Sequence, residues 1–515
     1  MNATDFLTLP ANGPAAAFSD IPVHDVTRLG SILGDALVSP GRRVLACFAL
    51  PKDDDSLRLV AVLGAAAEHT VLLASSTVGV DYPAYPALTP EVPALHWFER
   101  EIAEQYGITP TDHPWLKPIR FHKSWTPGRD AWQRPDAAPI EPGVVDNFTV
   151  EGGGEHEVAV GPVHAGVIEP GHFRFQCLGE DVHHLEISLG YQHRGIEKLL
   201  EGGPDPRALH YAETAVGDTT IASAWNYAAI IESLSGIQPS ADTLRLRAIL
   251  LELERMANHV GDLGALAGDV AYLPTQAYCG RIRGDYLNMT ADIAGNRFGR
   301  NVVVPGGMRQ PLEPGRSARI LADMRRVKRD LDLALKLLFN EPSALDRFEG
   351  TGPVDAATAR AIGLVGVAGR ASGLALDARH DFPHPGAVPP PRPALGKAGD
   401  VFNRMTVRRD EIEASHARLF RELEAAAKTG LTDVAPPPPA PLQPDAVAIA
   451  VTEAWRGELV HVAITDGDGR FRRYKIVDPS FHNWFGLALA LRGEQISHFP
   501  ICNKSFNLSY CGHDL

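Results

Sequence analysis

The chain contains 515 residues, of which 44% are hydrophobic and 22% are charged. This composition is typical of a soluble globular protein and excludes a wholly disordered, collagen-like or coiled-coil chain. Lysine and arginine number 49 against 63 aspartates and glutamates, a net charge of −14, which argues against a surface that follows nucleic-acid phosphates.

The sequence predicts no membrane span and no secretory signal. No uncharged apolar run is long enough to cross a bilayer as a helix. Residues 1–20 lack the basic region and apolar core of a signal peptide. We therefore expect a cytoplasmic protein whose contact with a membrane comes through partners.

The five cysteines are scattered and never form a Cys-x-x-Cys pair. They are Cys47, Cys177, Cys279, Cys502 and Cys511. Such spacing gives little support to a disulfide framework or to a zinc or iron–sulfur site built from thiolates alone.

Short apolar runs near the N-terminus are typical of the strands of a small sheet. They are Val44–Leu50, Leu57–Leu63 and Thr70–Ala74. Residues 95–107 predict a helix, because Trp97, Ile102 and Tyr106 lie close to helical spacing and Gly107 stands where a helix often ends. We expect one α/β domain over 21–125, followed by a proline-rich connector over 126–157.

Residues 158–515 predict a larger, mainly helical unit. Its expected helices are 208–235, 240–266, 317–339 and 399–428. Two proline-rich stretches, 385–393 and 436–444, predict loops or extended linkers. Residues 458–464 and 470–476 alternate around Asp466-Gly-Asp-Gly469, which is typical of a β-hairpin. The expected fold class is α+β, with a small N-terminal α/β domain fused to a large, mainly helical domain.

The predicted helix at 96–107 could by itself be a surface helix with an apolar stripe. However, His96-Trp-Phe-Glu-Arg-Glu-Ile102, followed by Tyr106-Gly-Ile108 and His113-Pro114, resembles the signature of the 30-kDa subunit of respiratory complex I. The resemblance implies that residues 21–125 form a domain of that type.

Later motifs resemble the 49-kDa, quinone-site subunit of complex I and the large subunits of group 4 membrane-bound [NiFe] hydrogenases. They include Gly161-Pro-Val-His164, Glu169-Pro-Gly-His-Phe-Arg-Phe175, Gly190-Tyr-Gln-His-Arg-Gly-Ile-Glu-Lys198, Glu252-Leu-Glu-Arg-Met-Ala-Asn-His259 and Gly295-Asn-Arg-Phe298. Fusion of both modules in one chain is similar to the large subunits of formate hydrogenlyase and hydrogenase-4 type complexes. The resemblance implies a hydrogenase large-subunit fold for residues 158–515.

In these hydrogenases four cysteine thiolates hold nickel, because soft sulfur donors bind nickel and bridge it to iron. The register fixed by Glu213, Gly217 and Ser505 leaves no cysteine at any of the four ligand positions. These positions are Val216, Thr219, Ser509 and Gly512. Cys511 lies one residue out of register, so the resemblance implies a nickel-free relative. We also expect none of the C-terminal processing that accompanies nickel insertion in the family.

The complex I precedent places a quinone headgroup between a His-x-x-x-His loop and a tyrosine on the following helix. This chain has His164, but Ile168 stands at the second histidine position and Gly217 lies near the tyrosine position. A ubiquinone site of that kind is therefore not supported residue by residue.

Three polar side chains remain as candidates for a proton relay or cavity lining. Glu169 matches the hydrogenase glutamate that relays protons, although a glutamate before a proline is often a solvated or capping residue. His164 is alternatively a loop histidine bonded to backbone. Asp218 is costly to bury unpaired, so it should be exposed or paired with an arginine or histidine.

Two charged blocks favour structural ion pairs over catalysis. Arg194-Gly-Ile-Glu-Lys198 predicts an ion-pair network or, alternatively, residues that orient a partner's iron–sulfur cluster. Glu252, Arg255 and His259 share one helical face and predict a buried network.

The resemblance implies a subunit of a membrane-associated, multi-subunit oxidoreductase on the cytoplasmic face. Its expected partners are an iron–sulfur small subunit that carries a [4Fe–4S] cluster and membrane antiporter-like subunits, but no nucleic acid. The chain itself is expected to bind no cofactor directly.

Three alternatives stay open. They are an NAD(P)H:quinone oxidoreductase-type catalytic subunit, an active hydrogenase-4 or formate hydrogenlyase large subunit, and a structural scaffold with a dead cavity. No Gly-x-Gly-x-x-Gly follows a predicted strand, so NAD would bind elsewhere in such a complex.

Overall fold

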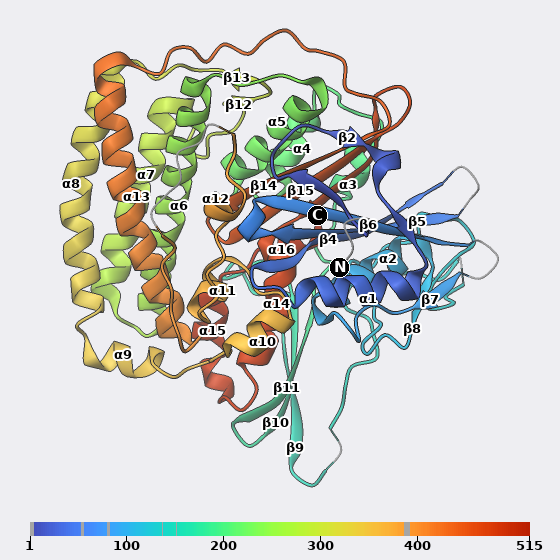
Figure 1. Ribbon diagram of the computed structural model, residues 1–515. Helices are drawn as coiled ribbons and strands as arrows, with labels where there is room; N and C mark the ends of the chain where they lie inside the picture. Colours follow the sequence, from blue (N-terminus) through green and yellow to red (C-terminus); the bar gives the residue numbers. More distant parts are fainter. Residues whose placement is uncertain (1–4, 53–55, 80–82, 136, 151, 386–391) are drawn as a thin grey trace.

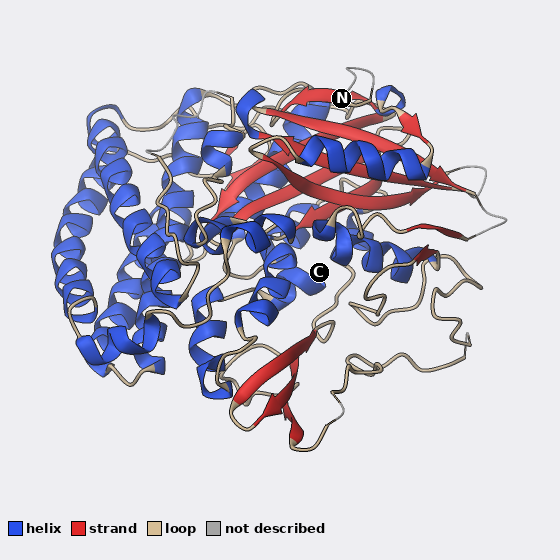
Figure 2. Cartoon of the chain, turned by 60° about the horizontal axis from the view of Figure 1, so that its bottom comes forward, coloured by secondary structure: helices blue, strands red, loops and turns tan. Residues whose placement is uncertain are grey.

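The structure is a computed structural model that describes residues 5–52, 56–79, 83–135, 137–150, 152–385 and 392–515. Two larger sheets lie next to each other, a bundle of long helices packs at one end, and a small sheet projects from the body (Figures 1 and 2). The predicted α+β fold class is confirmed.

The N-terminal sheet has the strand order β1–β6–β5–β4, with β3 paired in parallel to β6. Its strands are β1 (Leu7–Pro10), β3 (Val23–His24), β4 (Arg42–Pro51), β5 (Leu57–Ala65) and β6 (Thr70–Val78). The three predicted strands are confirmed as β4, β5 and β6. Helix α1 (Val26–Leu37) packs on this sheet, and a short parallel pair follows, β7 (Ala84–Pro86) with β8 (Thr109–Thr111).

Helix α2 (His96–Tyr106) ends as predicted at Gly107, which takes a left-handed conformation with φ 65°. Every residue of α2 is buried, so the alternative of an exposed surface helix is wrong. The carboxylates of Glu99 and Glu104 accept backbone N–H groups from the loops beside them. The helix is therefore the central packing element between the N-terminal sheet and the rest of the chain.

The second sheet has the order β16–β15–β14–β2. Its strands are β2 (Ala16–Ala17), β14 (Ala446–Ala454), β15 (Gly457–Thr465) and β16 (Phe471–Val477). The predicted hairpin is confirmed as β15 and β16, whereas β14 was not predicted. Every residue of β14 and β15 is buried, so both faces of these strands are covered by other parts of the protein and neither face is exposed to solvent.

The long helices form the bundle that Figure 1 shows on the left. They are α6 (Ala241–Asp269), α7 (Leu273–Ala294), α8 (Pro314–Leu338) and α13 (Val401–Thr429). The helices predicted at 240–266, 317–339 and 399–428 are confirmed. The helix predicted over 208–235 is wrong as one element, because α4 (Ala208–Ala215) and α5 (Thr220–Ser235) are separated by residues 216–219.

The remaining elements are short. The helices are α3 (Ile196–Leu200), α9 (Pro342–Phe348), α10 (Ala356–Ala361), α11 (Gly366–Ala371), α12 (Ala378–Asp381), α14 (Pro479–Ala490), α15 (Phe499–Phe506) and α16 (Tyr510–Asp514). Short 3-10 turns cover Phe18–Asp20, Ala66–Glu68, Pro93–Leu95 and Ile496–His498. The projecting sheet contains β9 (Glu155–Val160), β10 (His172–Leu178) and β11 (Asp181–Ser188), and a two-residue pair joins β12 (Val303–Val304) to β13 (Gly307–Met308).

The proline-rich connectors behave as their composition predicts. In the predicted connector 126–157 the described residues up to 150 form neither helix nor strand, but strand β9 begins at Glu155, inside the predicted range. Residues 436–444 also form neither helix nor strand. Of the third stretch, 385–393, residues 386–391 lie outside the described part of the chain. The domain boundaries at 125 and 158 stay a prediction.

A buried ion network joins the N-terminal sheet region to the second sheet. The Lys475 ammonium on β16 lies 2.6 Å from a Glu101 carboxylate oxygen of α2 and 3.0 Å from Glu197 of α3. Arg120 also contacts Glu101, and Arg473 lies 2.8 Å from Glu197. Such charges are stable inside a protein only when each keeps its partners.

Replacing Lys475 by methionine should therefore lower the free energy of unfolding by about 3 kcal/mol, because Glu101 and Glu197 stay buried with one cation fewer. Chemical denaturation of the purified chain measures the loss. Arg325→Met, which removes an exposed pair with Glu424, should cost less than about 1 kcal/mol. Equal losses in the two variants would contradict a structural role for the buried network.

Candidate functional site

The helix predicted over 208–235 breaks where the resemblance places the first pair of metal ligands. Val216 is extended, with φ −135° and ψ 114°, and α5 begins only at Thr220. The first N–H groups of α5 bond to a side chain of another helix, since Ile221 N donates to Glu254 Oε2 at 2.8 Å. A side chain from another helix therefore caps the N-terminus of α5, and the spacing of apolar residues in the sequence could not reveal this cap.

The C-terminal segment is bonded to the motif at residues 190–198, close to this break. Ser509 caps the start of α16, and its Oγ accepts the Gly512 N–H at 2.9 Å. Asp514 accepts N–H groups from Gly190 and Gln192, each at 2.8 Å. The C-terminal residues are therefore fixed to the motif at 190–198.

These two segments pack directly against each other. A Cβ built on Gly512 would lie 2.9 Å from Val216 Cγ2 and 2.7 Å from Asp478 Cγ. We call residues 216–219 together with 509–515 the junction. The structure thus brings the two halves of the family's ligand motif together, and Val216 packs where a side chain at 512 would project.

Asp218 forms the main ion pair of the junction. Its carboxylate oxygens lie 2.6 and 2.9 Å from the two terminal nitrogens of Arg456, and its backbone carbonyl accepts the Trp455 indole N–H at 3.0 Å. Burial raises the pKa of Asp218, but the Arg456 guanidinium outweighs this effect and holds the pKa below its usual value. The expectation that Asp218 is either exposed or paired is confirmed in its paired form.

His164 and Glu169 lie in the loop between β9 and β10, and both are half-buried. His164 Nε2 lies 2.7 Å from the carbonyl oxygen of Gly171, so this nitrogen carries the proton and the histidine bonds to backbone. Glu169 Oε2 accepts the Tyr510 N–H at 3.4 Å, a long hydrogen bond.

Helix α16 lies between these candidates and the 216–219 loop. Cys511 is influenced from both sides: burial and the charge of Glu169 raise the pKa of its thiol to about 11, while a backbone hydrogen bond with Gly217 acts in the opposite direction. The thiol is therefore protonated at neutral pH. Glu169 contacts α16 of the junction, whereas Asp218 lies in its 216–219 loop and pairs with Arg456. Among the described contacts the two carboxylates make no bond to each other.

The two charged blocks were predicted to form ion pairs, and the structure pairs their residues differently. Glu252, Arg255 and His259 do form part of a buried network, with Glu411 accepting from His259 at 2.8 Å. In the other block Glu197 pairs with Arg473 and Lys475 of β16 rather than with Arg194. Arg194 instead donates to the carbonyl oxygens of Thr214 and Ala215 at the end of α4.

Comparison with known proteins identifies the family. Residues 38–136 match the description "Respiratory-chain NADH dehydrogenase, 30 Kd subunit", and residues 269–435 match the corresponding 49 Kd subunit. The chain is also 30% identical to the carbon monoxide-induced hydrogenase of Rhodospirillum rubrum over 68% of its own length and 97% of that protein. It belongs to the complex I–hydrogenase large-subunit family.

Two further family members match the chain across both modules. Formate hydrogenlyase subunit 5 of Escherichia coli (strain K12) is 29% identical over 84% of this chain and 77% of its own length. Hydrogenase-4 component G of the same organism is 28% identical over 86% of this chain and 78% of its own length. The two resemblances read from the sequence are thereby confirmed. In the part of the chain that the structure describes, no helix has the length and apolar character needed to cross a membrane.

The side chains of the junction do not fit the family's nickel–thiolate centre. Val216 has no donor atom and Gly512 has no side chain, while the Ser509 hydroxyl accepts the Gly512 N–H and lies 3.3 Å from Cys511 Sγ. Neutral hydroxyls are poor ligands for a soft metal. Among the described residues, no group of three or more His, Cys, Asp and Glu side chains is arranged to hold a metal ion.

Sequence reasoning missed two charged residues of this family site, Arg456 and Asp478. Arg456 lies in the turn between β14 and β15 and carries no local signal. Asp478 caps α14 through the Ser480 N–H at 2.8 Å, and the Asp-Pro pair at 478–479 could have revealed this role. Its other oxygen is buried and has no hydrogen-bond partner among the described residues, and burial raises the pKa of this carboxyl.

Gly512→Ala tests the packing of the junction. The added methyl group would meet Asp478 and Val216, so the variant should unfold about 1–3 kcal/mol more easily than the wild type. Gly315→Ala is the matched control, because a Cβ there has nothing within 4 Å and a helix favours alanine. Denaturant titration of the three proteins measures the difference, and the account fails if the two variants behave alike.

Proposed function

We propose that the chain is a subunit of a membrane-associated, multi-subunit oxidoreductase that works without nickel-dependent H₂ chemistry. Membership of the family, whose relatives include a subunit of formate hydrogenlyase, supports the assignment to such a complex. Electrons would arrive from a [4Fe–4S] cluster of a small subunit that docks near the junction on the cytoplasmic face, while antiporter-like subunits form the membrane arm.

One observation carries the nickel-free part of this proposal. Val216 packs against Gly512 at the place where the family holds its metal, and the neighbouring Asp218 is neutralised by Arg456. A closed contact between a hydrocarbon side chain and a glycine supplies neither a ligand nor space for one. The active-hydrogenase alternative requires cysteines that positions 216, 219, 509 and 512 lack. The quinone alternative requires a histidine and a tyrosine where Ile168 and Gly217 stand.

Exposed apolar side chains near the junction support a docking partner. Val163 and Val167, on either side of His164, are 83% and 79% exposed. Phe298, which is 41% exposed, lines a small cavity together with Asp218. Large apolar groups at a surface are typical of protein–protein contacts, and a small subunit would cover them.

Glu169 is the residue of this site best placed to exchange protons. It is only half-buried, it bonds to the backbone of α16, and its charge acts on Cys511. His164, fixed to the Gly171 carbonyl, lies in the same loop. Asp218 has the weaker claim, because Arg456 holds it in the ionised form.

Elemental analysis tests the absence of nickel. The protein, purified with its partners from cells that mature [NiFe] hydrogenases, should contain far less than one nickel per chain, because no thiolate pair is available at 216–219 or 509–512. A hydrogenase large subunit prepared from the same cells is the control for nickel supply. About one nickel per chain would contradict the proposal.

Glu169→Gln separates a working cavity from a scaffold. The change keeps the size and removes the titratable proton, so turnover of the assembled complex should fall roughly 100-fold while assembly is unaffected. Glu157→Gln, on the neighbouring strand β9 and paired with Arg174, should retain wild-type turnover. Unchanged turnover in Glu169→Gln and also in His164→Ala would favour the scaffold alternative.

A further inference from the structure

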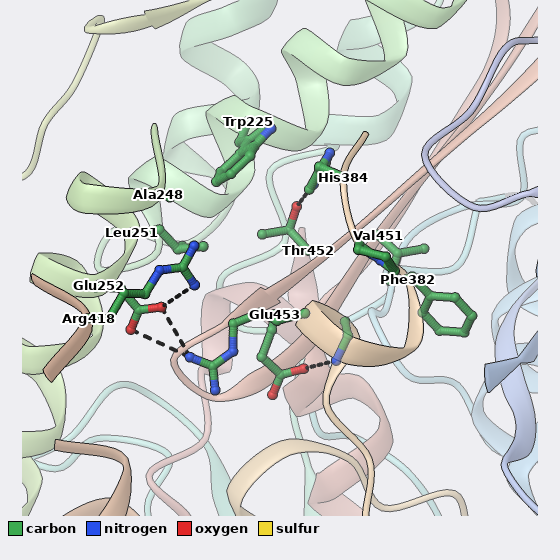
Figure 3. A pocket seen from close by; sticks show the side chains of 13 residues that line it. Trp225, Ala248, Leu251, Glu252, Phe382, His384, Arg418, Val451, Thr452 and Glu453 are labelled. Carbon is green, nitrogen blue, oxygen red and sulfur yellow. Dashed lines mark hydrogen bonds and ion pairs between the residues drawn. The ribbon is translucent and has the colours of Figure 1, made fainter. Parts of the chain in front are cut away.

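A cavity distinct from the junction lies among α5, α6, α12, α13 and β14. Figure 3 shows Trp225 and His384 on one side of it and Glu252, Arg418 and Glu453 on the other. Its volume is about 30 Å³, enough for one or two water molecules. We call it the inner cavity.

The inner cavity adjoins a larger one, which we call the outer cavity. Trp225 and His384 line both, and the outer cavity has a volume of about 190 Å³. The exposed residues Pro14 and Gln238 contribute to its wall, so it reaches the protein surface. The stacked rings of Trp225 and His384, with centroids 4.5 Å apart, form the wall that the two cavities share.

Two buried donors in the inner cavity have no partner among the described protein atoms. They are the indole N–H of Trp225 and the Nε–H of Arg418, in side chains that are more than nine-tenths buried. Leaving a buried donor unpaired costs about 1–3 kcal/mol, and buried water commonly satisfies such groups. The two donors therefore indicate that water occupies the inner cavity.

The charged groups around this cavity form a cluster of ion pairs that adjoins a second cluster. Four arginines pair with Glu252, Asp377, Glu411 and Glu453; they are Arg255, Arg370, Arg379 and Arg418. An adjoining cluster places two carboxylates, Asp381 and Glu458, on the single cation Arg43. Asp377 N donates to Asp381 and joins the two groups. If every carboxylate is ionised, these described ion pairs balance in the first cluster and leave one excess negative charge in the second, within reach of the first.

We propose that Glu453 is a proton-exchange site that water in the inner cavity supplies. Its carboxylate lies 1% exposed at the cavity wall, with one oxygen 2.7 Å from Arg370 and the other 2.9 Å from the Ala378 N–H. In the exchange one O–H bond forms on a Glu453 oxygen and one O–H bond of a hydronium ion breaks. A neutral carboxylic acid and a water molecule result, with no change in oxidation state.

The surroundings distinguish Glu453 from the other glutamate of the cavity. Burial raises the pKa of Glu453 to about 7, and the charge of Asp377 adds to this, against the attraction of Arg370, Arg255 and Arg379. For Glu252, burial also raises the pKa, but Arg379, Arg255 and Arg418 together lower it to about 2.

The other groups that line or border the cavity do not titrate in the same range. Burial lowers the pKa of His384 to about 3, so that histidine is neutral. Arg370 holds the pKa of Glu411 well below its usual value in spite of burial.

Burial also raises the pKa of Asp381 and of Glu458, which pair with Arg43 and do not line the cavity. Of the two described glutamates that line the cavity, Glu453 has one arginine partner and Glu252 has three, so Glu453 is the one whose charge changes near neutral pH.

The pH dependence of stability tests the proposal. Because the pKa of Glu453 is higher in the folded chain than the usual glutamate value of about 4.3, the folded state binds more protons than the unfolded state between these two values. The contribution of Glu453 to wild-type stability therefore falls as the pH rises from 5 to 8. Glu453→Gln removes this loss, so its melting temperature relative to the wild type should rise by a few degrees over that range.

Glu252→Gln is the matched control, measured on the full chain purified with its partners. It removes a buried carboxylate from the same cavity that stays ionised throughout, so its offset from the wild type should be the same at pH 5 and pH 8. If the offset of Glu453→Gln is equally constant, Glu453 does not exchange a proton in this range and the proposal is overturned.

Infrared spectroscopy gives a second test that does not need Glu453→Gln to fold. At pH 5 the wild type should show a carboxylic acid signal that exchanges in heavy water, because water in the inner cavity lies beside Glu453. Ala248→Val places two methyl groups in the inner cavity and should slow that exchange at least tenfold. A signal that exchanges equally fast in both proteins, or no such signal in the wild type, would overturn the proposal.

Discussion

The contact between the 216–219 loop and helix α16 requires that position 512 carry no side chain. Gly512 lets Val216 and Asp478 approach, and Asp514 then fixes the segment by bonding to Gly190 and Gln192. Three neighbouring features follow from this constraint. The break between α4 and α5, the ion pair of Asp218 with Arg456 and the position of Glu169 all depend on where α16 lies.

Elements with a local signal could be predicted from the sequence. Gly107 ends α2, and the Asp466–Gly469 turn joins β15 to β16, because glycine tolerates the left-handed backbone that each place needs. The proline-rich connectors also follow from composition. The helix break at 216–219 could not be predicted in this way, because Glu254 caps α5 from a different helix.

The sequence predicted which segments form the candidate site, but it did not predict most of the ion pairs and hydrogen bonds within it. Motif register placed Val216 and Gly512 in one site, and the structure packs them together. Arg456 and Asp478 carry no family signature in the sequence, yet they set the charge of the junction. The same limit applies to Glu453, whose environment is assembled from five helices and strands that are distant in sequence.

An experimental density map of the assembled complex at side-chain resolution tests the central claim most directly. The account predicts continuous packing between Val216 and Gly512, the Asp218–Arg456 ion pair intact beside it, and no metal density between the 216–219 loop and α16. A strong density peak held by Cys511 and the hydroxyls of Thr219 and Ser509 would contradict it.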